Sequence, residues 1–263
     1  MATAVFFHAH PDDEAIQTGG TMARMAADGH RVVLVTATRG ELGEVPEGLL
    51  SPGEDLAGRR AVELAAACEV LGVARHEYLG YRDSGMAGEP TNEDPSCFWR
   101  ADVDEAATRL ADILDQEHAE VFATYDENGG YGHPDHSAGP GGGWRAAPRA
   151  GTERVFMATM NRDHMLSLAD RADEFGLAMP DEQRAMLDTL GVHADRITTA
   201  VDVSDYLDRK RRAMQVHASQ ISDTSFFLMM PPVAFAAVWG TEWYIRVGAP
   251  ADTGVEDSLL VGR

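Results

Sequence analysis

The chain of 263 residues has 44% hydrophobic and 25% charged residues, which is ordinary for one large globular domain. Acidic residues outnumber basic ones by 43 to 22, for a formal net charge of −21. Such a charge repels phosphate backbones and anionic lipids, so we expect neither nucleic-acid binding nor membrane docking. The sequence shows no secretory signal pattern and no membrane-length apolar segment, and we expect a cytoplasmic protein.

The first half of the chain alternates segments that are typical of strands and helices. Short apolar runs rich in β-formers predict strands, and apolar residues at helical spacing predict the helices between them. The expected strands are 3–10, 31–38, 76–81 and 119–126, and the expected helices are 11–29, 56–73 and 101–118. This order predicts an α/β fold with a Rossmann-like, mostly parallel sheet flanked by helices. Ligands of such sheets bind beyond the carboxyl ends of the strands.

The second half of the chain is less regular. Two strand-like runs, one helix and one apolar stretch broken by prolines occupy 154–160, 197–203, 204–221 and 226–239. The apolar stretch is short and interrupted, so we expect it in the core rather than in a membrane. No repeat or low-complexity linker marks a boundary. We therefore expect one domain over 1–263, with a core at 1–160 and a C-terminal region at 161–263 that completes the site.

Two segments at the expected strand ends carry the same His-Pro-Asp order. They are AHPDDE at 9–14 and YGHPDH at 131–136. Catalytic zinc takes three protein ligands from imidazole and carboxylate groups and keeps a fourth position open. His10 and Asp13 can reach one point across a strand-to-helix turn, and His136 can add the third ligand from a neighbouring strand. Two imidazoles with one carboxylate suit zinc or iron(II) better than magnesium.

The neighbouring residues suggest further roles in hydrolysis. Asp12 is adjacent to Asp13 and can take a proton from the attacking water. His133 can donate a hydrogen bond to the oxyanion or a proton to the leaving amine, and Asp135 can orient or charge that imidazole. Glu14 is expected to complement the helix dipole at the first turn, with support of the site as the alternative.

With these motifs, the sequence resembles the PIG-L/LmbE-like zinc-dependent N-deacetylases. The likeness covers nearly the whole chain and includes AHPDDE, TRGELGE, RRAVELAAACEVLGV, YRDSGM, DENGGYGHPDH, RVFMATMNRD and KRRAMQVHASQI. YRDSGM together with NGGYGHPDH is similar to the mycothiol-related branch, which contains the mycothiol-pathway deacetylase and mycothiol S-conjugate amidase. The resemblance implies a Rossmann-like sheet with an added smaller region.

The resemblance also implies roles for individual residues. The metal ligands would be His10, Asp13 and His136, and the general base would be Asp12. The residues that act as acid or stabilise the oxyanion would be His133, Asp135 and a mobile Tyr131. The substrate-binding residues would be Arg60, Asp83 and Glu44. From the residues alone, Arg60 could be a solvated helix charge, and Asp83 could pair with Arg82. His217 and Gln220 lie one helical turn apart, so they could share a face near the site or belong to the core.

One segment departs from the family pattern. After the second motif, where the family continues with a regular helix, the chain reads SAGPGGGWRAAPRAG. Pro140 and the glycines at 141–143 are expected to break or delay this helix. Since His136 stands just before the break, a wider site mouth or weaker metal retention would follow.

The favoured function is hydrolytic removal of an acyl group, most simply acetyl, from the nitrogen of an amino sugar or mycothiol-related small molecule. A deacetylase that tailors an aminoglycoside or another secondary metabolite is the first alternative. A non-catalytic metal- or sugar-binding protein of the same fold is the second. A nucleotide-dependent Rossmann enzyme would need a glycine-rich loop where this chain has HAHPDDE. A homo-oligomer is compatible with the fold, but the sequence does not decide it.

Overall fold

The computed structural model describes residues 1–130, 132–175, 181–250 and 254–260. Its centre is a seven-stranded sheet in the order β3-β2-β1-β4-β5-β7-β6. The strands are β1 (Thr3–His8), β2 (Arg31–Thr36), β3 (Arg75–Tyr78), β4 (Val121–Tyr125), β5 (Arg154–Thr159), β6 (Thr199–Asp202) and β7 (Thr241–Arg246). The first five strands in this order pair in parallel, and β7 runs antiparallel to both β5 and β6. The predicted α/β class with a mostly parallel sheet is confirmed.

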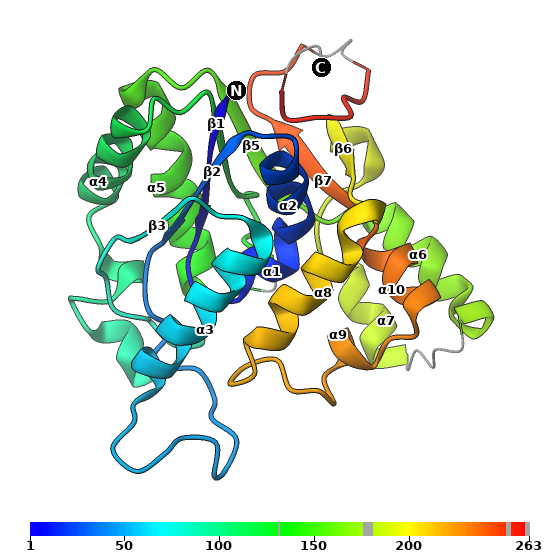
Figure 1. Cartoon of the computed structure of the whole chain (residues 1–263), viewed down its shortest axis with the longest axis horizontal. Coiled ribbons are helices and arrows are strands. Elements are labelled where there is room, and N and C mark those ends of the chain that lie inside the picture. The colour runs from blue at the N-terminus through cyan, green and yellow to red at the C-terminus, as the bar shows by residue number, and fades with distance from the viewer. Residues whose placement is uncertain (131, 176–180, 251–253, 261–263) are drawn as a thin grey trace.

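Helices cover both faces of the sheet (Figure 1). The α-helices are α1 (Asp13–Gln17), α2 (Gly19–Ala27), α3 (Leu56–Leu71), α4 (Val103–Gln116), α5 (Pro134–Ala150), α6 (Arg162–Asp170), α7 (Asp181–Leu187), α8 (Leu207–Val216), α9 (Phe226–Met229) and α10 (Pro232–Trp239). One apolar cluster joins the sheet to α2, α3 and α8, and a second joins it to α4 and α5. Phe6 and Phe7 of β1 point to opposite faces and are both fully buried, which explains the uninterrupted apolar run of this strand.

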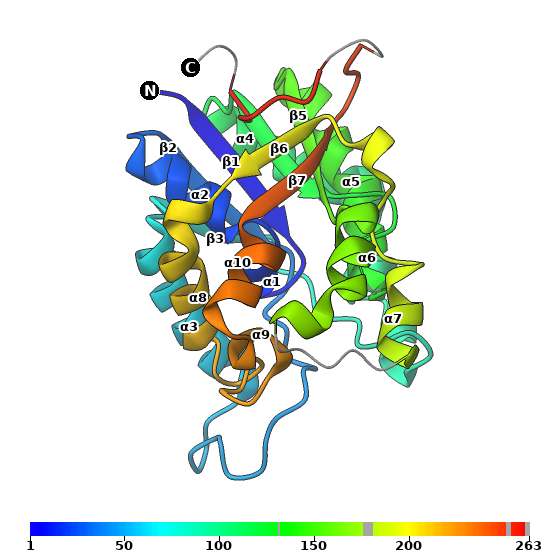
Figure 2. The same ribbon diagram turned by 90° about the vertical axis from the view of Figure 1, so that its right-hand side faces the viewer.

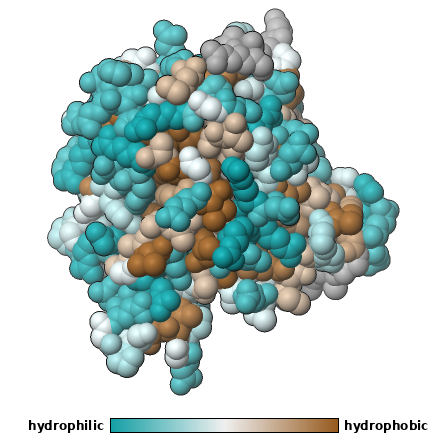
Figure 3. Space-filling model, in the orientation of Figure 1, coloured by the Kyte–Doolittle hydropathy of each residue, from teal (hydrophilic) through white to brown (hydrophobic). Residues whose placement is uncertain are grey.

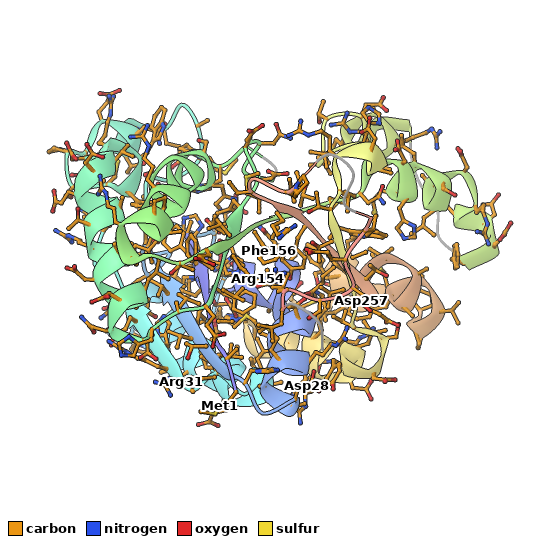
Figure 4. The ribbon with its side chains drawn as sticks, turned by 90° about the horizontal axis from the view of Figure 1, so that it is seen from above. Met1, Asp28, Arg31, Arg154, Phe156 and Asp257 are labelled. Carbon is orange, nitrogen blue, oxygen red and sulfur yellow. The ribbon has the colours of Figure 1, made fainter. Side chains whose placement is uncertain are left out.

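The strand order places the two His-Pro-Asp segments side by side. From β1 the chain moves outward through β2 and β3, then returns to β4 on the other side of β1. This reversal is the point at which open α/β sheets bind ligands, beyond the carboxyl ends of the strands. Figure 4 views the opposite end, where Met1, Arg31 and Arg154 stand near the beginnings of β1, β2 and β5. The segments that follow β1 and β4 therefore meet at the far end of the sheet.

The expectation of a broken helix after His136 is wrong. The helix α5 runs from Pro134 to Ala150 through Pro140. Proline removes one hydrogen bond, but packing against α4 and β4 compensates for it. A β-carbon on Gly143 would lie 2.9 Å from the Thr124 hydroxyl, so glycine lets the helix approach the sheet closely. Gly143, one of these weak helix formers, thus allows the close contact of α5 with the sheet.

The second half of the chain contains more structure than the sequence suggested. Its expected strands and the long helix are present as β5, β6 and α8, whereas α6, α7 and the strand β7 were not predicted. Figure 2 shows α10 below β7, with α8 on one side of it and α6 on the other. The expected helix 11–29 is two helices, α1 and α2, that meet at Thr18. Among the described residues, no helix is long and apolar enough to cross a membrane.

A buried ion pair ties this second half to the first motif. Lys210 of α8 and Glu242 of β7 are 2.5 Å apart and almost wholly inaccessible to solvent. The Lys210 ammonium also donates to the Ile16 carbonyl at 2.7 Å, and Glu242 accepts the backbone N–H groups of Gly20 and Thr21 at 2.8 Å each. Since the carboxylate sits at the positive N-terminus of α2, the pair anchors α1 and α2 against α8 and β7.

The close contact of α2 with the second half predicts unequal effects of two neighbouring substitutions. A β-carbon on Gly20 would lie 2.6 Å from two carbon atoms of the buried Val203 side chain. One on Gly19 would meet its nearest neighbour, the Glu14 carbonyl oxygen, at 3.3 Å. We expect Gly20→Ala to lower the free energy of unfolding by about 1–3 kcal/mol in urea titrations. Gly19→Ala, the matched control, should change it by less than about 1 kcal/mol, and equal losses would contradict this packing.

Candidate active site

Three potential metal-ligating atoms converge beyond β1 and β4. The His10 Nδ1 and Asp13 Oδ2 atoms are 3.4 Å apart, His136 Nε2 lies 3.2 Å from the same Asp13 oxygen, and the two histidine nitrogens are 3.3 Å apart. Tetrahedral zinc with bonds of 2.0–2.1 Å separates its ligand atoms by about 3.3–3.4 Å. All three side chains are nearly or fully buried. The geometry and chemistry of this donor set fit a small divalent ion.

Each of these side chains is oriented by a hydrogen bond to another group. The Tyr125 hydroxyl donates to Asp13 Oδ2 at 2.6 Å, and the tyrosine ring stacks on that of His136. The outer nitrogen of His136 bonds the Gly129 carbonyl at 3.0 Å, and the outer nitrogen of His10 bonds Asp135 at 3.0 Å. Such outer bonds place the ring protons away from the shared point and leave the inner lone pairs free for a metal.

Asp135 has a different neighbour from the one expected. Its Oδ2 atom contacts the His10 ring and accepts the Ser84 backbone N–H at 3.1 Å, while the Ser84 hydroxyl bonds Oδ1. The bond that joins Asp135 to His133 runs from the Asp135 backbone N–H to His133 Nδ1, at 3.2 Å. The carboxylate therefore orients His10, whereas the sequence suggested His133. Adjacent positions at the start of α5 point in different directions, which the sequence spacing does not reveal.

His133 is the N-cap of α5. Because its Nδ1 atom accepts a backbone N–H, the neutral ring carries its proton on Nε2. The ring lies beside those of His10 and His136, with ring nitrogens within 4.8 Å of one another, and its Nε2 is 3.9 Å from an Asp83 oxygen. Burial and the neighbouring histidines lower the pKa of His133 to about 4. His133 is thus a neutral hydrogen-bond donor next to the three ligating atoms.

Asp12 has an unusual backbone conformation. With φ at 106°, it is one of two non-glycine residues with positive φ in the described part of the chain, which costs about 1–3 kcal/mol. Its N–H donates to Glu14 at 2.9 Å, and its carboxylate lies 3.3 Å from the Arg60 guanidinium. Burial raises the pKa of Asp12 to about 6, opposed by the Arg60 charge and reinforced by that of Asp13. The side chain is a stronger base than a solvated aspartate.

Arg60 and Asp83 both lie at the site, so the two simpler interpretations of these residues are wrong. Arg60 is only 4% exposed, and its guanidinium donates to the carbonyl groups of Gly40 and Pro11. It is not a solvated helix charge. Asp83 accepts backbone N–H groups of Leu42 and Gly85, while the adjacent arginine side chain pairs with Asp94 and Glu41 instead.

Glu44 lies further from the ligating atoms. Its side chain is exposed on the loop 39–55, which projects below α3 in Figure 1 and forms a largely hydrophilic lobe in Figure 3. Its carbonyl oxygen accepts the Gln220 amide at 3.1 Å. Glu41 of the same loop is nearer: it accepts the Asp83 N–H at 3.2 Å, and its second oxygen is buried without a hydrogen bond among the described residues.

Sequence reasoning missed Tyr125, Ser84 and Glu41. Tyr125 and Ser84 occur at or after the ends of β4 and β3, and this position was the signal that could have identified them. Tyr131, the predicted mobile tyrosine, lies outside the described residues. The role assigned to it stays a prediction.

The bond from Tyr125 to Asp13 predicts a measurable effect on metal binding. Tyr125→Phe removes the hydroxyl that donates to the ligating oxygen, and we expect zinc affinity to fall about tenfold to hundredfold. Titration against a competing chelator measures this loss. Tyr244→Phe is the matched control, because Tyr244 is equally buried but bonds Thr21 and Glu242. A similar loss in both variants would mean that general packing, not the Asp13 bond, is responsible.

Comparison with known proteins places the chain among similar sequences. A family model described as PIG-L, GlcNAc-PI de-N-acetylase, matches residues 5–147. The chain is 41% identical to a 1D-myo-inositol 2-acetamido-2-deoxy-alpha-D-glucopyranoside deacetylase of Acidothermus cellulolyticus, over 100% of this chain and 95% of the relative. A protein of the same name from Thermomonospora curvata is 38% identical over 98% and 94%.

A solved structure of N,N'-diacetylchitobiose deacetylase from Pyrococcus horikoshii has the same fold. The TM-score is 0.59 at 22% identity, over 95% of this chain and 84% of that one. This likeness concerns the fold alone, whereas the relatives near 40% identity span the whole chain. The resemblance drawn from the sequence motifs is confirmed: the chain belongs to the PIG-L family.

Proposed function

We propose that the protein is a metal-dependent N-deacetylase acting on N-acetylglucosamine linked to myo-inositol, a step in mycothiol formation. The observation that carries the proposal is the triangle of ligating atoms from His10, Asp13 and His136. Asp12 directly precedes the ligand Asp13 in the chain. The names of the full-length relatives supply the substrate. In the reaction the amide C–N bond breaks, water supplies the new C–O bond, and the products are acetate and the free amine.

The ion that His10, Asp13 and His136 would hold is zinc, with iron(II) as the alternative that the same donors accept. When bound, such an ion supplies Lewis-acid polarisation and activates water at neutral pH. The three residues are at most 5% exposed, so few of their atoms contact bulk water. Tyr125, Gly129 and Asp135 keep the three lone pairs directed at one position.

Asp12 and His133 take different parts in the reaction. Asp12 takes the proton of the attacking water, because its carboxylate is ionised at neutral pH and adjoins the ligand Asp13. His133 presents an Nε2 proton near the ligating histidines and donates a hydrogen bond to the developing negative charge on the amide oxygen. Asp12 then passes the proton that it took from water to the departing amine, because the neutral His133 ring has no acidic proton to give. Tyr131 is proposed to assist His133 in stabilising the oxyanion.

The surroundings of the site favour a neutral, hydroxyl-rich substrate. Asp83 lies beside His10 and His133, and Glu41 reaches it from the loop 39–55. Carboxylates accept hydrogen bonds from sugar hydroxyls, and Arg60 beneath them is engaged by backbone carbonyls. Glu44, exposed on the same loop, is kept as a proposed contact for the distal part of the substrate.

The remaining expectations from the sequence fit this proposal. The C-terminal region 161–263 contributes to the site of the core 1–160 within one domain, and bonds from His217 and Gln220 to the first half support this arrangement. A homo-oligomeric assembly and a cytoplasmic location stay predictions.

The proposed function is tested by metal analysis and acetate release. We expect about one zinc or iron per chain, and acetate release from the inositol-linked substrate to exceed that from free N-acetylglucosamine at least about tenfold in kcat/KM. Preferential cleavage of an aminoglycoside or another N-acetylated metabolite in the panel would move the substrate to secondary metabolism. Bound metal without turnover of any substrate would favour a non-catalytic binding protein, and no metal uptake would refute the site.

Asp12→Asn separates catalysis from metal binding. The amide cannot accept the proton of water, so we expect kcat to fall about 10²- to 10⁴-fold while metal content stays at the wild-type level. His136→Ala is the comparison variant, because it should lose metal and activity together. An Asp12→Asn protein that retains wild-type kcat would exclude Asp12 as the base.

A further inference from the structure

Two buried side chains from distant parts of the chain meet behind the general base. Glu14 is in the first turn of α1, and His217 is the C-cap of α8, 203 residues further on. Both are fully buried, and His217 Nε2 donates to Glu14 Oε1 at 2.6 Å. The other ring nitrogen of His217 has no hydrogen bond among the described residues. The ring is therefore placed by its bond to Glu14.

The second oxygen of Glu14 is hydrogen-bonded to the backbone of Asp12. Its Oε2 atom accepts the Asp12 N–H at 2.9 Å. On the other end of the same peptide group, the Arg60 guanidinium donates to the Pro11 carbonyl. The peptide that joins Pro11 to Asp12 is thus fixed at both its polar atoms, one from α3 and one through Glu14 from α8.

These two hydrogen bonds to the Pro11–Asp12 peptide explain how Asp12 keeps its positive φ. A half-turn flip of the peptide before Asp12 would bring its φ from 106° to about −74°, in the ordinary right-handed range. The flip would point the N–H away from Glu14 and the Pro11 carbonyl away from Arg60. Both hydrogen bonds would be lost in a buried environment, and this loss opposes the relaxation.

We propose that Glu14 and His217 are positioning residues that hold the Pro11–Asp12 peptide in its strained orientation and thereby direct the Asp12 carboxylate at the attacking water. The inference rests on the proposed function, because it assigns the pair to the base of that reaction. It gives the C-terminal region a specific task in catalysis, which His217 performs through its hydrogen bond to Glu14.

Two substitutions of His217 test the pair by kinetics. His217→Leu removes the donor to Glu14 at similar volume, and we expect kcat to fall about tenfold to hundredfold with KM within about threefold and metal content unchanged. His217→Gln keeps an N–H at the position of Nε2 and should retain at least about one third of the wild-type kcat. Ser219→Ala is the matched control, because Ser219 is buried in the same segment but bonds Glu63 of α3.

A variant background separates positioning from general support. In Asp12→Asn protein the base is already absent, so His217→Leu should lower the residual rate by no more than about twofold. A purely structural role would reduce it as much as in the wild type. Hydrogen exchange of the metal-free proteins gives a readout independent of turnover: the Asp12 amide should exchange at least about tenfold faster in His217→Leu and Glu14→Leu than in wild type or Ser219→Ala.

The outcomes that overturn the proposal are distinct from failure of the proposed function. Wild-type kcat in His217→Leu, additive losses in the Asp12→Asn background, or unchanged exchange at Asp12 would each refute positioning by this pair. If His217→Leu does not fold, His217→Gln in both backgrounds and its Asp12 amide decide the question. If the wild-type protein releases no acetate, the proposed reaction fails, and hydrogen exchange still decides whether the pair holds this peptide.

Discussion

The structure depends on holding three lone-pair-bearing atoms within 3.4 Å of one another in a buried place. Atoms of this kind repel one another, and burial removes the water that would screen them. The protein therefore restrains each side chain by a hydrogen bond. Tyr125 bonds Asp13, the Gly129 carbonyl bonds His136, and Asp135 bonds His10. A divalent ion at the centre would turn this repulsion into attraction, so metal affinity and the cost of assembling the site have the same origin.

The fold and the convergence of His10, Asp13 and His136 could be predicted because each depends on local pattern or on one rule of topology. Apolar runs such as that of β1 identify buried strands, and alternation with helices predicts a parallel sheet. Ligands then gather at strand ends, which was sufficient to bring His10 and Asp13 together with His136. The same pattern could not show that α5 continues through Pro140, because close packing on the sheet outweighs low helix propensity there.

The hydrogen-bond partners of the candidate ligands could not be predicted from the sequence, for a different reason. Asp135 bonds His10, 125 residues away, and not the nearby His133 ring, because side-chain direction at a helix start depends on the exact turn geometry. Tyr125 looked like an ordinary strand residue. Arg60 looked like a surface charge, since nothing local reveals that two carbonyl groups and Asp12 surround its guanidinium. Contacts across such separations are properties of the packed structure.

Buried polar contacts link the C-terminal half of the chain to the first half. Three buried polar links join α8 and the segment after it to the first half: Lys210 with Glu242 and Ile16, His217 with Glu14, and Ser219 with Glu63. A buried charge that loses its partner costs several kcal/mol, so these links oppose independent movement of the two halves. The strained Asp12 conformation persists only while its surroundings over-determine it. Through His217 and Glu14, the second half of the chain thus contributes to the hydrogen bonds that hold the backbone of Asp12, the proposed base.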